Sequence, residues 1–234
     1  IADQDNTFYV LNKFSGERLK IIPTESVNLK NEFISSLALG NNSFFFLNTY
    51  GSLYSINSQN QKIQWFTNFN QSLDLNSGNL FYSNAILAHN DKVLVSTDPY
   101  LYVLNSDTGM IISKNSITSI VKPIISQQGL FLITKDNLLV YKKLNSEKII
   151  YSINITEKIA SYLDTKKKSI SVKSFFIVNN DLFVFLENSY LVKFSKEGKI
   201  KKINKLPDKL GTLPILISNS IIYLNKKNKL IILD

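Results

Sequence analysis

Cysteine is absent from this chain of 234 residues, and histidine occurs once, as His89. Without cysteine the chain can form neither an internal disulfide nor a thiolate metal site. Its compartment stays open, because large domains need no disulfides even where the environment is oxidising. One histidine in a predicted turn cannot form a histidine cluster for catalysis or metal binding. No segment approaches the roughly 20 consecutive apolar residues that a membrane-spanning helix needs.

Arginine is almost absent, although the chain is basic. There are 27 lysine and arginine residues against 18 acidic ones, a net charge of +9, and Arg18 is the only arginine. Specific contacts to phosphates and bases favour the guanidinium group, so this composition argues against nucleic-acid recognition. Two interpretations of the lysines remain open. They reflect an AT-rich genome, or they form a basic face toward anionic lipid headgroups or an acidic partner.

A short apolar phrase recurs six times along the chain. The first residues of successive copies are 37 to 53 positions apart, and the first three copies end in asparagine. A β-type unit that recurs every ~40–50 residues is typical of the blades of a β-propeller. The six copies begin at Phe8, Leu53, Leu101, Leu138, Leu191 and Leu230.

Each complete repeat predicts four short antiparallel strands joined by Asn-, Asp-, Gly- and Ser-containing turns. The second and third strands begin 8 or 9 positions apart in every repeat, as a fixed hairpin register requires. The predicted first strands are Phe33–Leu39, Asn84–Ala88, Pro123–Ser126, Ser174–Val178 and Leu213–Ile217. The predicted second strands are Phe44–Asn48, Val93–Thr97, Leu130–Thr134, Leu182–Leu186 and Ile221–Asn225.

The sequence therefore predicts an all-β fold, a β-propeller of four-stranded antiparallel blades, with four full blades and two incomplete ones. We expect one domain over residues 1–234. The predicted blades are 1–27 (third and fourth strands only), 33–69, 83–118, 122–155, 173–206 and 212–234 (no outer strand). A propeller closes when one terminus completes the blade that the other began. We therefore expect a natural C-terminus and a missing N-terminal portion.

Two inserts interrupt the array. The first, residues 68–82, is rich in Asn, Ser and Gly, and the second, residues 156–171, is basic. Within the second insert, Glu157–Leu163 predicts a short helical turn. Long loops on propellers are frequent binding regions, although a solvated excursion is the simpler interpretation of the lysine run at 166–168.

The repeat resembles that of the PQQ-like (pyrroloquinoline-quinone-type) propeller family. The best copy runs from Leu53-Tyr54-Ser55-Ile56-Asn57 to Lys62-Ile63-Gln64-Trp65, and the next combines Leu101–Asn105 with Thr108-Gly109. The resemblance covers nearly the whole chain and is specific for the repeat class. Members typically end the fourth strand in tryptophan, whereas Trp65 is the only tryptophan here; we expect it to pack between blades.

The resemblance implies one of two functions. PQQ-dependent dehydrogenases typically hold quinone and calcium with acidic and amide side chains, often beside a vicinal disulfide. This chain has no cysteine and carries its acidic residues mostly in turns. BamB-like proteins, in contrast, are non-enzymatic components of outer-membrane β-barrel protein assembly. They are periplasmic and are held at the outer membrane by an N-terminal lipid anchor.

We therefore expect a BamB-like protein-binding scaffold, with the β-barrel assembly machinery as partner, no nucleic-acid partner and no enzymatic activity. Peripheral membrane association would come from a lipidated cysteine in the missing N-terminal portion. Two alternatives stay open. One is a remnant of a PQQ-dependent dehydrogenase, and the other is a sensor or binding module of a larger envelope protein.

No residue pattern indicates a catalytic, cofactor-binding or metal site. The candidate partner-binding residues lie instead in the turns between second and third strands. Tyr50 and Tyr100 occupy equivalent turns, and tyrosine is favoured at interfaces, so the pair predicts a patch on one face of the propeller. The candidate residues are Tyr50, Asp98, Pro99, Tyr100, Lys135 and Asp136.

Overall fold

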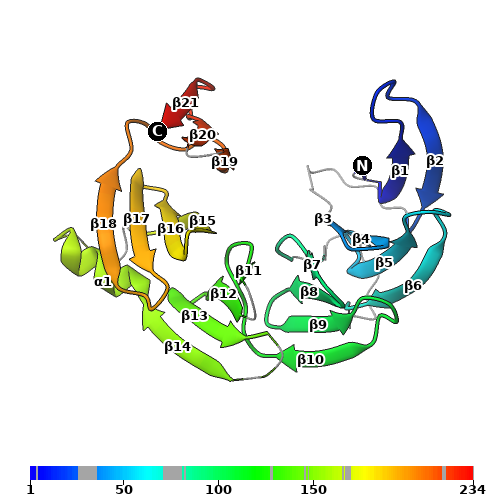
Figure 1. Ribbon diagram of the computed structural model, residues 1–234, viewed down its shortest axis with the longest axis horizontal. Coiled ribbons are helices and arrows are strands. Elements are labelled where there is room, and N and C mark those ends of the chain that lie inside the picture. The colour runs from blue at the N-terminus through cyan, green and yellow to red at the C-terminus, as the bar shows by residue number, and fades with distance from the viewer. Residues whose placement is uncertain are drawn as a thin grey trace. The chain divides into compact units, whose positions relative to one another are not determined.

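The computed structural model describes residues 1–3, 5–25, 36–70, 81, 83–126, 129–144, 146, 148–164, 166, 170–217 and 220–233. Its contacts divide the chain into two compact units, Ile1–Thr118 and Ser119–Asp234. Each unit consists of three antiparallel sheets, and each sheet corresponds to one predicted blade (Figure 1).

The first unit holds blades 1 to 3. Blade 1 has two strands, and blades 2 and 3 have four each, in chain order across the sheet. Blade 1 is β1 (Thr7–Leu11) and β2 (Arg18–Pro23). Blade 2 is β3 (Ser36–Leu39), β4 (Ser43–Leu47), β5 (Ser52–Asn57) and β6 (Ile63–Asn68). Blade 3 is β7 (Leu87–His89), β8 (Lys92–Ser96), β9 (Leu101–Asn105) and β10 (Ile111–Asn115).

The second unit holds blades 4 to 6 and the helix α1 (Ile155–Tyr162). Blades 4 and 5 have four strands and blade 6 has three. Blade 4 is β11 (Ile124–Ser126), β12 (Gly129–Ile133), β13 (Leu138–Lys143) and β14 (Ile149–Asn154). Blade 5 is β15 (Val172–Val178), β16 (Asp181–Leu186), β17 (Tyr190–Ser195) and β18 (Ile200–Lys205). Blade 6 is β19 (Ile215–Ile217), β20 (Ser220–Leu224) and β21 (Leu230–Leu233).

The predicted all-β fold, with four full and two incomplete blades, is confirmed. The short helix is confirmed too, although it begins at Ile155 rather than Glu157, because the Asn154 side chain caps it by accepting from the Glu157 amide. The grouping of all six blades into one domain stays a prediction. Most of the insert at 68–82, the start of the first predicted strand at 33–35 and part of the lysine run lie outside the described residues.

Three innermost strands are shorter than predicted, for two physical reasons. β7 begins at Leu87 instead of Asn84. The Ile86 amide donates to the Ser36 hydroxyl (2.7 Å) and therefore takes no part in the pairing with β8. β11 and β19 begin one residue after Pro123 and Pro214. Proline has no N–H to donate, so both ladders start after it.

The asparagine that ends the recurring phrase closes the turn to the fourth strand. Its side-chain oxygen accepts two backbone N–H groups of the turn, in the manner of an Asx turn. Asn12 accepts from residues 14 and 15, Asn57 from residues 59 and 60, and Asn105 from residues 107 and 108. The sequence repeat is therefore a repeat of turn chemistry as well as of apolar strands.

The chain before β1 also pairs with that strand, which adds to the two strands predicted for blade 1. The Tyr9 amide donates to the Ile1 carbonyl (2.8 Å), and Ala2 forms a bridge with Phe8. The Asp3 carboxylate accepts from the Asp5 and Thr7 amides. Residues 1–3 thus lie where a second strand lies in the other blades.

Alternate residues of the second strands of blades 2 and 5 pack against different neighbouring blades. In β4, Phe46 packs with Phe8 of blade 1, whereas Phe45 packs with Val93 of blade 3. In β16 of the second unit, the even-numbered residues from Leu182 face the core shared with blade 4. Side chains alternate across a strand, so such a sheet buries both faces only between two neighbours.

Trp65 joins blades 2 and 3, as predicted. Its indole N–H donates to the Ser106 carbonyl (3.0 Å), and its ring lies against Gly109. Gly109 has a φ of +73°, and a Cβ atom there would come within 2.5 Å of the indole ring. Glycine therefore serves both the turn and the close approach of the blades.

A polar network centred on Glu25 joins blades 1 and 2 and fixes the turn at Tyr50. The Glu25 carboxylate accepts from Asn48 Nδ2 (2.6 Å), Ser52 Oγ (2.8 Å) and Tyr54 Oη (2.6 Å). Burial alone would raise the pKa of Glu25, but the hydrogen bonds from Tyr54, Ser52 and Asn48 outweigh it and hold the pKa below its usual range. Burial and the same carboxylate raise the pKa of Tyr54.

Replacing Gly109 by alanine will destabilise the protein by about 1–3 kcal/mol, because the variant adds a collision with Trp65 to the strained backbone. Gly16→Ala is the matched control. Gly16 has the same φ of +73°, with nothing within 4 Å of its would-be Cβ. Urea unfolding followed by tryptophan fluorescence will measure both variants. An equal loss of unfolding free energy in Gly109→Ala and Gly16→Ala would show that the contact with Trp65 contributes nothing to the difference.

Glu25→Gln will lower the stability at pH 7 by about 1 kcal/mol, a modest amount because the carboxylate is partly exposed to solvent. The depressed pKa means that the ionised Glu25 stabilises the fold above its unfolded pKa, about 4.3, and ceases to do so as the pH falls through its folded pKa. The difference between parent and variant should therefore shrink below about pH 4.

The control for this measurement is Glu17→Gln, which removes an exposed carboxylate from the β1–β2 turn. We expect it to change the free energy of unfolding by less than about 0.5 kcal/mol at either pH. A gap between Glu25→Gln and the parent that stays constant from pH 7 to pH 3 would argue against the network.

Candidate functional site

The predicted partner-binding residues of the first unit lie in two turns, β4–β5 in blade 2 and β8–β9 in blade 3. These turns join the second and third strands, and so lie at the same end of their respective blades. Asp98 and Pro99 are exposed, whereas Tyr50 and Tyr100 are half-buried. The turns thus present an exposed tip in blade 3 and partly covered tyrosines in both blades.

Side chains from blade 1 and from blade 2 itself hold the turn at Tyr50. The Asn48 side-chain oxygen accepts from the Tyr50 amide (3.0 Å) and from the Ser52 amide (2.9 Å). Asn6, fully buried, accepts from the Thr49 amide (3.0 Å) and donates through Nδ2 to the Thr49 hydroxyl (2.7 Å). Tyr50 is therefore presented on a backbone that is fixed on both sides.

The turn at Tyr100 is fixed by its own backbone and by a lysine. The Asp98–Pro99 peptide bond is cis, and Thr97 donates to the Tyr100 carbonyl through its amide (2.8 Å) and its hydroxyl (2.9 Å). Lys114 Nζ lies 3.9 Å from the centre of the Tyr100 ring. This cation–π contact occupies one face of the ring, so a partner would meet the other parts of Tyr100 and the exposed tip.

A row of aromatic rings connects the two turns. Phe81, whose amide donates to the Thr49 carbonyl and whose ring lies against Gly51, stacks on Phe69 at a centroid distance of 6.1 Å. Phe69 contacts Tyr102 at 4.7 Å, and Tyr102 contacts Tyr100 edge-on at 5.9 Å. The row gives the two turns a common apolar base that resists relative movement.

Sequence reasoning did not identify Phe69, Phe81 or Lys114 as parts of this site. Phe69 and Phe81 lie near the two ends of the insert at 68–82, and an aromatic residue near each end of a segment rich in Asn, Ser and Gly is the signal that could have found them. Lys114 lies on β10, and only the pairing of β10 with β9, which sets Lys114 opposite Tyr102, brings it near the turn.

Lys135 and Asp136 occupy the equivalent turn of blade 4, between β12 and β13. Both side chains are exposed, and the turn is closed by the Asn137 amide, which donates to the Thr134 carbonyl (2.9 Å). Asn137 itself has a φ of 58°, which asparagine tolerates better than most residues. The two residues belong to the second unit, and their role in partner binding stays a prediction.

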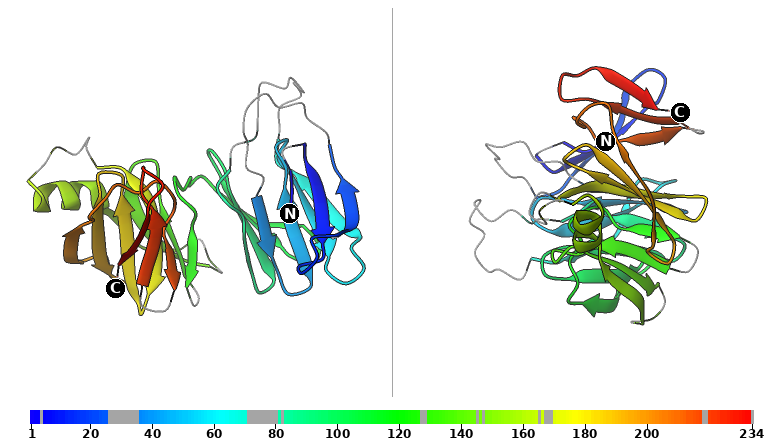
Figure 2. Two further views of the ribbon diagram at one scale, coloured as in Figure 1. Left: turned by 90° about the horizontal axis from the view of Figure 1, so that it is seen from above. Right: turned by 90° about the vertical axis from the view of Figure 1, so that its left-hand side faces the viewer.

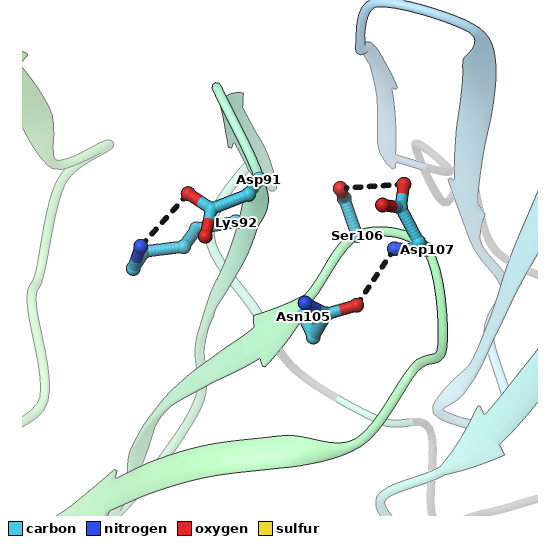
Figure 3. A network of polar contacts seen from close by, with 5 residues as sticks. All are labelled: Asp91, Lys92, Asn105, Ser106 and Asp107. Carbon is cyan, nitrogen blue, oxygen red and sulfur yellow. Dashed lines mark hydrogen bonds and ion pairs between the residues drawn. The ribbon is translucent and has the colours of Figure 1, made fainter.

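A polar hollow of about 250 Å³ lies at the opposite end of blades 2 and 3. Asn41, Asn90, Asp91, Ser106 and Asp107 are among its lining residues. Figure 3 shows Asp91 turned toward Lys92, with which it forms an ion pair at 2.8 Å, while Asp107 accepts from the Ser106 hydroxyl (3.2 Å).

The carboxylates of this hollow do not form a metal site. Hydrogen bonding by Lys92 lowers the pKa of Asp91, and one oxygen of its carboxylate is held in that ion pair. In the described part of the chain no group of three or more His, Cys, Asp or Glu side chains could hold a metal ion. Nor, in that same part, is any helix long and apolar enough to cross a membrane.

An apolar hollow of about 360 Å³ lies between blades 1 and 2. Its lining includes Phe8, Val10, Leu37, Leu39 and Phe44, from β1, β3 and β4. Leu39 is 68% exposed at the edge of this hollow. The hollow lies where the sheet of blade 1 meets the first two strands of blade 2.

Comparison with known proteins supports the fold and leaves the function open. No family model matches the sequence, and no curated protein sequence matches it. Among solved structures, the chain is similar to BamB from Moraxella catarrhalis, with a TM-score of 0.56 and 10% identity over 97% of this chain and 76% of that one. At this identity the likeness concerns the fold alone: the chain has a β-propeller fold of antiparallel blades.

Proposed function

We propose that this chain is a non-enzymatic protein-binding scaffold, a BamB-like component of outer-membrane β-barrel protein assembly in the periplasm. The observation that carries the proposal is the similarity to BamB over 97% of the chain, which includes the incomplete blades at both ends. The expected partner is the barrel-assembly machinery, and the expected attachment to the outer membrane is peripheral.

The geometry of the turns suits such a scaffold. Each strand of blades 2 and 3 is anchored in a sheet, and the tyrosines emerge from turns that hydrogen bonds and the row Phe81–Phe69–Tyr102–Tyr100 hold in place. A partner that binds preformed turns loses less conformational entropy than one that must order them. Tyr50, Tyr100 and the exposed Pro99 add apolar contact area beside the exposed Asp98.

Photo-crosslinking will test where partners bind. Benzoyl-phenylalanine is placed at position 50 or 100, and the variant is expressed in its native cell. Each variant should cross-link to a component of the barrel-assembly machinery. Phe14 is the matched control position, because it is 88% exposed and lies at the other end of its blade, in the β1–β2 turn. Cross-linked products identified by mass spectrometry that contain no barrel-assembly component would refute the proposal.

Truncation of side chains in these two turns should weaken the interaction with the partner without unfolding the protein. We expect Tyr50→Ala combined with Asp98→Ala to raise the dissociation constant for the cross-linked partner about tenfold, as loss of an interfacial tyrosine typically does. Phe14→Ala should leave the constant unchanged. Thermal unfolding of each variant will show that the fold is retained. Equal affinity of the parent, the double variant and Phe14→Ala for the partner would exclude these turns from the interface.

A further inference from the structure

The excess of positive charge lies in the second unit of the chain. Residues 1–118 contain seven of the 27 basic residues and nine of the 18 acidic ones, a net charge of −2. Residues 119–234 contain the other 20 basic residues, all lysine, and nine acidic ones, a net charge of +11. A bias in genome composition acts on both halves alike, so it does not explain this division.

Lysines of the second unit gather at the turn between β20 and β21 of blade 6. Lys226, Lys227 and Lys229 belong to this turn. Lys209 lies beside it, because its carbonyl accepts from the Lys226 amide (3.1 Å). All four side chains are exposed, and we call these four residues the lysine turn. The hairpin of β20 and β21 is drawn in red in Figures 1 and 2.

The side chain of Asn225, which is 2% exposed, fixes the backbone of the lysine turn. Its oxygen accepts from the Lys227 amide and from the Lys229 amide, both at 2.9 Å. Its Nδ2 atom donates to Asp208 Oδ2 at 3.0 Å. The lysines therefore project from a preformed turn, so an anionic surface that binds them has little backbone to order.

The charge of the lysine turn is largely uncompensated. Asp208 is the single acidic residue in the sequence between positions 205 and 229, and its carboxylate already accepts from Asn225. Within the described residues, none of the four ammonium groups of the lysine turn forms an ion pair. Four cations against one carboxylate give this end of blade 6 a positive potential.

Two exposed leucines border the lysine turn. Leu230 follows Lys229 directly and is 61% exposed, and Leu213 is 64% exposed. The segment before Leu213 is held against the hairpin, because the Leu224 amide donates to the Thr212 hydroxyl (3.0 Å) and Leu224 pairs with Leu230. Long cationic side chains beside exposed aliphatic ones are typical of protein surfaces that lie on membranes.

We propose that the lysine turn binds the anionic headgroups of a lipid bilayer. The four ammonium groups would lie at the level of the headgroups, and Leu213 and Leu230 would lie against the upper part of the acyl chains. Clustered lysines attract an anionic membrane through their summed charge. This inference goes beyond the proposed function, because the contact needs neither the barrel-assembly machinery nor a lipid anchor.

A bilayer fits the lysine turn better than an acidic protein segment does. The turn is the exposed tip of a hairpin, which a broad surface can meet with several lysines at once, whereas a protein segment docks along a sheet edge or in a groove. Headgroup attraction depends on the number of charges and not on the bidentate geometry of arginine. The bordering leucines suit acyl chains and contribute nothing to pairing with carboxylates.

Co-sedimentation of the full chain with vesicles tests the proposal. The chain should bind vesicles made of equal parts of phosphatidylcholine and phosphatidylglycerol, should not bind vesicles of phosphatidylcholine alone, and should be released by added salt. We expect Lys226→Gln combined with Lys227→Gln and Lys229→Gln to lower the partition coefficient about a hundredfold. This variant keeps Asn225, so the turn should retain its backbone, and thermal unfolding will show that the protein is folded.

The matched control removes three lysines from the same unit. Lys143→Gln combined with Lys148→Gln and Lys199→Gln makes the same charge change at exposed residues in or beside the turns between third and fourth strands of blades 4 and 5. We expect the partition coefficient to fall less than about fivefold, because only the net charge of the unit changes. Equal losses in the two triple variants would mean that only net charge matters, and would overturn the proposal.

A fluorophore at a single cysteine tests which part of the chain meets the bilayer. The chain has no cysteine of its own, so Leu213→Cys labelled with the polarity-sensitive dye NBD carries one probe. Its fluorescence should increase on vesicles that contain phosphatidylglycerol, because the probe leaves water. Phe14→Cys with the same label is the control, since Phe14 is 88% exposed in the first unit. No response at position 213, or equal responses at both positions, would contradict the proposal.

Two further ligands separate a bilayer from other anions. Inorganic phosphate should release the chain from vesicles no better than chloride at equal ionic strength, and a fluorescein-labelled peptide of glutamates should not bind the parent in fluorescence anisotropy. If the peptide binds and the vesicles do not, the lysine turn recognises protein and the proposal fails. Vesicles contain no protein, and the cross-linking at positions 50 and 100 concerns the other unit, so failure of either proposal can be told apart from failure of the other.

Discussion

Burial of both faces of central strands such as β5 and β12 is the constraint on which the structure depends. β5 is buried over its first five residues, and β12 over its whole length. A sheet with two apolar faces cannot be stable alone in water, because each face must be covered by another layer. Each blade therefore depends on its neighbours in the unit, as in repeat proteins generally. At about 25 cal/mol per Å² of buried apolar surface, these contacts dominate the stability of each unit.

The same constraint separates structural from functional residues. The strands are committed to packing, and so variation can accumulate in the turns and inserts. Between blades, a few polar contacts of fixed geometry supplement the apolar ones, such as Trp65 with the Ser106 carbonyl and Glu25 with Tyr54. The Glu25 contacts help to set the position of the Tyr50 turn through Asn48 and Ser52, so the stability of the junction between blades 1 and 2 and the presentation of that surface are physically linked.

Much of the fold could be predicted from the sequence, because its signals are local. Short apolar strands, the Asn-, Asp-, Gly- and Ser-containing turns between them, and a constant hairpin register need only neighbouring residues. The exact starts of the inner strands could not be predicted. The hydrogen bond from the Ile86 amide to the Ser36 hydroxyl joins residues 50 positions apart, and no local rule anticipates it. For the candidate site, the sequence identified the turn residues but not the ring contacts beneath them.

The sequence by itself determined the number of blades, the order of their strands and the lysine-rich character of the chain. Those properties follow from the spacing of the repeats and from composition, which can be read from the sequence without knowing any tertiary contact. Tertiary structure decided which residues meet: Phe69 with Tyr102, Lys114 with Tyr100, and the helix of 155–162 with β18. These pairs depend on how strands cross and turns close in three dimensions, and packing of the buried faces fixes that geometry.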